Sequence, residues 1–173
     1  MPAGIGSIFT CVSRPASAVA LSARPKAVST EIGFAERAAT AKASFQLRLS
    51  GTTGGKFTDT TGFTTLVWVP DATAPDTTDG AVHEHLQAGK WWSTQNIDGA
   101  KDFARVSLDA IAEAQPNAVV DHYGVSIGRG SAATSTLVDA VTFNGCTTNF
   151  AKKDAEPETG SGSLGNLSNI FGS

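Results

Sequence analysis

The sequence predicts an all-β fold: an antiparallel β-sandwich or jelly roll with one short helix, flanked by an irregular N-terminal arm and a C-terminal tail. Short segments that alternate apolar and polar residues, or are rich in β-branched and aromatic residues, are separated by Gly-, Thr- and Asn-rich loops. A single segment has a helical pattern, whereas a parallel sheet would need many helices between its strands. Asn144-Gly145 stands between two strand-like runs and is the strongest hairpin signal in the chain. The 173 residues suffice for one domain with a substantial core.

The expected strands are short and end at turn-forming residues. Phe45, Leu47 and Leu49 alternate with polar residues, as in a half-buried strand. In chain order the expected strands are 45–49, 63–69, 90–94, 119–127, 137–143 and 146–150. The segments 51–62 and 71–89 are expected to be loops because they are rich in Gly, Thr and Asp.

One helix is expected over 108–114. Ser107 or Asp109 can cap it, and Pro116 stops it. A second segment, 31–43, has helix-forming composition without a clear apolar stripe.

The strands and the helix place the sandwich domain at 43–151. Residues 1–42 are expected to form an arm, because they show no strand alternation. Residues 152–173 are expected to form a flexible tail, because they are first charged and then rich in Gly and Ser.

Composition argues against two classes of partner. A net charge of -3 and a pI near 5.5 disfavour nucleic acid, whose phosphates require a face rich in Lys and Arg. No apolar run approaches the roughly 20 residues needed to span a bilayer, so membrane insertion is not expected. The N-terminus lacks the basic and apolar regions of a recognisable secretory leader.

The two cysteines, Cys11 and Cys146, allow at most one disulfide. Two unpaired thiols are the simpler interpretation. A Cys11–Cys146 bridge would tie the arm to the last hairpin and would indicate an oxidising compartment.

No catalytic signature is present, and the protein is expected not to be an enzyme. The sequence contains no G-x-S-x-G elbow, and its three His residues lie in no recognisable nucleophile motif. Glycoside hydrolysis needs two facing carboxylates, and Asp139 stands alone on its expected strand.

Two segments of the 71–89 loop have the composition of metal sites. Asp71, Asp76 and Asp79 are closely spaced, which suits Ca²⁺, although an ordinary acidic loop has the same composition. His83 and His85 would share one face of a strand and could bind Zn²⁺ with a third ligand, although residues of a polar loop are usually solvated. No other cofactor is expected.

Trp91 and Trp92 are the candidate ligand contacts. Neighbours on one strand face opposite sides of a sheet, so one ring should fill the core while the other lies outside or beneath a loop. An outward Trp offers a flat apolar face to a sugar ring and an amphipathic rim to a protein.

The blocks GFTTLVWVPD, GKWWST, SLDAIAEAQPNAVVDHYGVSIG and VDAVTFNG resemble a β-sandwich domain of secreted and cell-surface proteins of actinobacteria. The resemblance covers about residues 44–150 and implies a concanavalin-like jelly roll, with no activity attached to it. Cys146 and Asn149 depart from the pattern, which usually has Thr and Asp there. The segment 156–160 is close to a sortase signal, but Glu156 stands where Leu is needed.

These observations favour a non-catalytic secreted or cell-surface module that binds glycan, cell wall or a protein partner. A structural subunit of a surface or virion assembly is the alternative, in which the arm and tail would reach neighbouring copies and form an oligomer. A glycan-active hydrolase is the second alternative.

Overall fold

The computed structural model describes residues 32–40, 43–70, 76–101, 103–127 and 136–150, and the backbone of 8–9 and 19–20. In these residues, strands form two antiparallel sheets, and one α-helix, α1 (Leu108–Ala114), accompanies them. None of the described helices is both long and apolar enough to cross a membrane. The predicted fold class is therefore confirmed.

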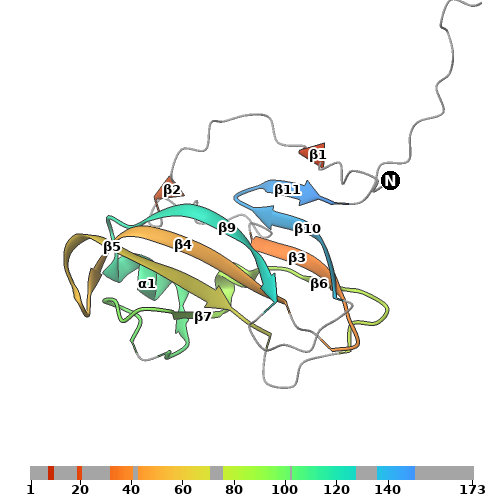
Figure 1. The fold of residues 1–173 in the computed structure, drawn as a ribbon, viewed down its shortest axis with the longest axis horizontal. Coiled ribbons are helices and arrows are strands. Elements are labelled where there is room, and N and C mark those ends of the chain that lie inside the picture. The colour runs from red at the N-terminus through yellow and green to blue at the C-terminus, as the bar shows by residue number, and fades with distance from the viewer. Residues whose placement is uncertain are drawn as a thin grey trace, which may run out of the picture.

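The first sheet has five strands and the second has six (Figure 1). In spatial order, the first comprises β1 (Ile8–Phe9), β11 (Cys146–Asn149), β10 (Leu137–Phe143), β3 (Ile32–Arg37) and β6 (Ala81–His83). The second comprises β2 (Val19–Ala20), β9 (Val119–Ile127), β4 (Ala43–Gly54), β5 (Phe57–Trp68), β7 (Lys90–Ser93) and β8 (Val106–Ser107). The chain passes several times from one sheet to the other, as in a jelly roll.

The two sheets share one hydrophobic core. Alternate residues of β4, namely Phe45, Leu47 and Leu49, are buried, so the other side of that strand faces outward. Phe34 on β3 contacts Phe45 at 6.3 Å between ring centroids, which joins the first sheet to the second. Trp91 on β7 contacts the same Phe45 ring edge-on at 6.3 Å.

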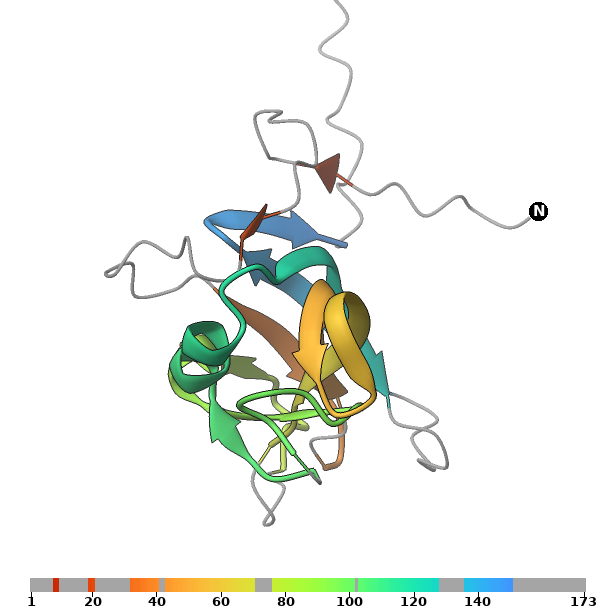
Figure 2. The same ribbon diagram turned by 90° about the vertical axis from the view of Figure 1, so that its left-hand side faces the viewer.

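Helix α1 closes the core beside the β4–β5 hairpin (Figure 2). Ser107 caps the helix by accepting a hydrogen bond from the Ala110 N–H, as predicted. The buried side chain of Gln115, just after the helix, accepts from the Thr53 N–H and donates to the carbonyls of Thr53 and Asp98, at 2.8–2.9 Å. This amide thus ties the hairpin to the segment that follows β7.

The predicted Asn144-Gly145 hairpin joins β10 to β11. Both turn residues have positive φ, 50° and 76°. Asn and Gly adopt this conformation more readily than other residues, which is why their pairing marks such turns.

Three segments differ from the prediction. Residues 81–83, expected within the 71–89 loop, form strand β6, which pairs with β3. Residues 32–37, expected in the arm with a helical tendency, form strand β3, which lies between β10 and β6 in the first sheet, because Ile32 and Phe34 pack in the core. The segment 51–62, expected to be a loop, completes the long β4–β5 hairpin. Its inward positions are occupied by small or polar residues such as Thr52 and Gly62, so the apolar alternation that marks a strand is missing.

The neighbouring tryptophans provide a matched test of this packing. Trp91 is 0% exposed and its indole N–H donates to the Leu86 carbonyl at 2.9 Å, so Trp91→Ala should lower the free energy of unfolding by about 3–5 kcal/mol. Trp92→Ala, at a half-buried position, should lower the free energy of unfolding by about 1 kcal/mol or less. Urea denaturation measures both values. Equal losses would contradict the assigned directions of the two rings.

Candidate functional site

Strand β7 directs its two tryptophans to opposite sides of the six-stranded sheet. Trp91 is fully buried in the core, so the alternation of the strand turns Trp92 to the outer face. Trp92 lies opposite Val67 of β5, which also faces outward because its neighbours Leu66 and Trp68 pack toward the core. Val67 is only 4% exposed although it lies on this face. The side chain of Trp92 therefore lies next to an apolar residue of the neighbouring strand.

Phe103 completes an aromatic pair with Trp92. The ring centroids lie 5.3 Å apart, with the ring planes inclined at 50°. This spacing is typical of favourable contacts between aromatic side chains. Phe103 is nevertheless 68% exposed, so most of its surface remains open beside the Trp92 ring.

The backbone of Phe103 is strained. Its φ is 58°, a region that bulky residues rarely adopt, and the Ala104 N–H donates to the Lys101 carbonyl at 2.9 Å to close the turn. Glycine would occupy this position without cost. A large exposed apolar ring at a strained position contributes little to stability, and such outliers are often functional.

Polar side chains continue the outer face next to the aromatic pair. Gln46 lies opposite both Val67 and Gly124, so one row crosses four strands from Trp92 to Gly124. Among the described residues other than its chain neighbours, no atom lies within 4 Å of where a Gly124 side chain would begin, so these residues leave the face open there. The next row contains Arg48 and His122, which are paired in register and exposed.

The sequence indicates Trp92 as a candidate ligand contact but gives no such indication for Phe103. Phe103 lies in a turn, where no periodicity marks its direction. Its contact with Trp92 arises because the chain folds back after β7, with Ile97 and Ala100 buried in the core. No local sequence signal could have found it.

The predicted calcium ligands are described in part. Asp71 lies outside the described residues, and Asp76 and Asp79 are exposed. Hydrogen bonds from the Thr78 hydroxyl and backbone N–H hold the pKa of the Asp76 carboxyl below its usual value. Across the described ranges, no group of three or more His, Cys, Asp or Glu side chains is placed to hold a metal ion. The calcium site stays a prediction.

His83 and His85 are placed differently from one another. Strand β6 ends at His83, so the alternation that would put both rings on one face does not extend to His85. His85 is exposed and has a φ of 57° before the 3-10 turn η1 (Leu86–Ala88). The zinc site also stays a prediction.

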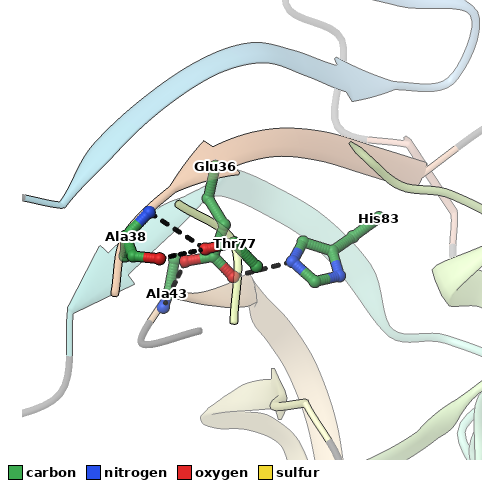
Figure 3. A network of polar contacts seen from close by, with 5 residues as sticks. All are labelled: Glu36, Ala38, Ala43, Thr77 and His83. Carbon is green, nitrogen blue, oxygen red and sulfur yellow. Dashed lines mark hydrogen bonds and ion pairs between the residues drawn. The ribbon is translucent and has the colours of Figure 1, made fainter. Parts of the chain in front are cut away.

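His83 instead belongs to a buried polar cluster (Figure 3). Its Nε2 lies 2.7 Å from the Glu36 carboxylate, and the side chains are 12% and 0% exposed. The same carboxylate accepts a hydrogen bond from the Ala43 N–H at 3.2 Å. Nearby, the Thr77 hydroxyl donates to the Ala38 carbonyl and accepts from the Ala38 N–H, both at 2.9 Å.

The cluster joins parts of the chain that are distant in sequence. Glu36 connects the end of β3 to the start of β4 and to β6. The His83 ring also packs against Phe34 and Trp68, with centroids 4.8 and 5.5 Å away. A carboxylate with two polar partners and a ring held between aromatic side chains is best interpreted as a structural clamp.

Cys146 is disulfide-bonded in the structure. Cys11, the other cysteine of the sequence, lies outside the described residues. The predicted Cys11–Cys146 pairing therefore stays a prediction.

Comparisons of the chain with protein-family models, curated proteins and solved structures find no match. Of the resemblance to secreted and cell-surface domains, the structure supports the β-sandwich fold.

The clamp predicts a large effect of one carboxylate on stability. Glu36→Ala should lower the free energy of unfolding by about 3 kcal/mol, because it leaves His83 and the Ala43 N–H without this acceptor. Glu84→Ala, at an exposed neighbouring position, is the control and should change it by less than about 0.5 kcal/mol. Urea titration compares the two, and an effect of Glu36→Ala no larger than the control would show that the clamp is not structural.

Proposed function

We propose that the protein is a non-catalytic binding module that holds a glycan on the outer face of the six-stranded sheet. The observation that carries the proposal is the outward Trp92 with the exposed, strained Phe103 beside it. The module would act outside the cell or at its surface, and the oxidised state of Cys146 supports an oxidising compartment.

The chemistry of a sugar ring fits this pair. One face of a pyranose consists largely of C–H groups, which pack on an aromatic ring, while its hydroxyls need polar partners. Trp92 and Phe103 offer apolar faces with little rotamer entropy to lose, and Val67 supports the Trp92 ring. Such a surface favours a ligand that is flat and apolar on one side.

The neighbouring row supplies the polar partners. The Gln46 amide can donate to and accept from hydroxyls, while the Arg48 guanidinium donates. His122 lies beside Arg48 and is exposed. Because Gln46 is in the same row as Trp92 and Arg48 and His122 form the next row, an extended oligosaccharide could lie across the strands.

The buried carboxylate among the described residues, that of Glu36, lies away from the Trp92 surface. Glu36 is enclosed in the clamp with His83 and does not face the Trp92 surface, because Phe34 and Trp68 lie against that histidine within the sandwich. This favours binding over hydrolysis, which requires two carboxylates on either side of a sugar.

A structural subunit of an assembly is the second candidate. The observation in its favour is that β1 and β2, both from the N-terminal part, pair with β11 and β9 at the outer edges of the two sheets. Edge pairing of this kind also joins neighbouring copies in assemblies. Light scattering tests it: a stable oligomer that binds no glycan would favour the assembly subunit.

Two substitutions test the binding module. Trp92→Ala should weaken glycan binding at least about tenfold, because it removes the central aromatic face. Phe103→Gly should also weaken binding, yet leave the free energy of unfolding unchanged or slightly higher, because glycine relieves the strained φ. Titration calorimetry against soluble glucose, N-acetylglucosamine and galacturonate oligosaccharides measures the affinities.

Phe63→Ala is the matched control, since Phe63 is an exposed aromatic on β5 that contacts Phe57 instead of Trp92. It should bind as the unaltered protein does. If no oligosaccharide binds, or if all three variants lose affinity equally, the proposal is wrong.

A further inference from the structure

We propose that the glycan is anionic, with carboxylates on its sugar rings, and that Lys90 and Lys101 recognise this charge. The inference rests on the proposed function, because it concerns the same aromatic surface. It is drawn from the charged residues that surround Trp92 and Phe103.

Lys90 lies on the same side of β7 as Trp92. The two residues are separated by the buried Trp91, and residues two apart on a strand share a face. The side chain of Lys90 is exposed, so its ammonium group can reach a ligand resting on the Trp92 ring.

Two further cations lie close to Phe103 in the sequence. Lys101 and Arg105 each stand two residues from Phe103, and both are exposed. The antiparallel register of β7 and β8 pairs Lys90 with Ser107 and Trp91 with Val106. Continued by one residue, the same register places Arg105 opposite Trp92. Arg105 already has an interaction partner, and the proposal therefore relies on the lysines.

The excess of positive charge is local. The chain as a whole carries -3, whereas the segment from Lys101 to Arg105 contains two cations and one acid, Asp102. With Lys90 these residues comprise three cations and one acid, a sum of +2. On the same outer face, the carboxylate of Asp121 accepts a hydrogen bond from the Ser50 hydroxyl at 2.9 Å.

An anionic sugar fits this combination better than a neutral one. A uronate places an apolar ring face and a carboxylate on one residue, and the rings of Trp92 and Phe103 would hold the first while an ammonium group binds the second. A neutral sugar could accept hydrogen bonds from the lysines through its hydroxyls but would lack the stronger, charge-assisted contact of a carboxylate. The charge of the lysines therefore discriminates among ligands that the two aromatic rings by themselves would bind equally well.

Galacturonate hexasaccharide and its methyl ester form a matched pair of probes, because esterification removes the charge and keeps the rings. The acid should bind the full chain at least about fivefold more tightly than the ester, and this preference should fall as salt rises from about 20 mM to about 300 mM. Lys90→Gln and Lys101→Gln should each weaken binding of the acid by about twofold to fivefold without changing that of the ester.

Lys56→Gln is the control, because Lys56 lies at the tip of the β4–β5 hairpin over the Phe57 ring. Equal affinity of acid and ester, with both lost in Trp92→Ala, would overturn the anionic preference and leave the binding module standing. Binding of the acid that survives Trp92→Ala, or that Lys56→Gln weakens as much as the other two, would show general charge attraction and also overturn it. Failure of every acidic and neutral oligosaccharide to bind would sink the proposed function itself.

Discussion

The packing of Trp91 between the two sheets is the interaction on which the described surface depends. Its ring meets Phe45 edge-on, and its indole N–H is satisfied by the Leu86 carbonyl. A ring this large, buried and hydrogen-bonded, has one favourable direction. Because β7 alternates, the same contact turns Trp92 outward and holds it above Val67. The burial of Trp91 thus both stabilises the core and sets the direction of Trp92, the candidate ligand contact.

The second ring of the surface depends on a different part of the structure. Gln115 binds Thr53 and Asp98 through its buried amide and so fixes the chain between β7 and α1. From this anchored segment the turn projects Phe103 against Trp92 in a strained conformation. The residue that follows helix α1 thus helps to position the segment that leads to Phe103. The positive φ of Phe103 is one of the observations on which the proposed binding role rests.

The Glu36–His83 clamp shows how a buried polar pair can resemble a functional site. The residues of this pair are those that metal sites and catalytic pairs use, yet their described contacts join β3, β4 and β6. The buried Glu36 also explains why the sequence does not predict a strand at residues 32–37. An acidic residue at an inward position breaks the apolar alternation, and its partner lies 47 residues away.

The sequence by itself determined the β-sandwich, the helix at 108–114, the Asn144-Gly145 hairpin and the opposite directions of Trp91 and Trp92, because each depends on neighbours in the chain. It missed β3 and the 51–62 part of the hairpin, where inward positions hold Glu, Thr or Gly. Only the tertiary structure decided which tryptophan is buried and that Phe103 meets the other one. Both outcomes require contacts between distant segments, since one face of β7 becomes the inner face only when the first sheet and η1 cover it.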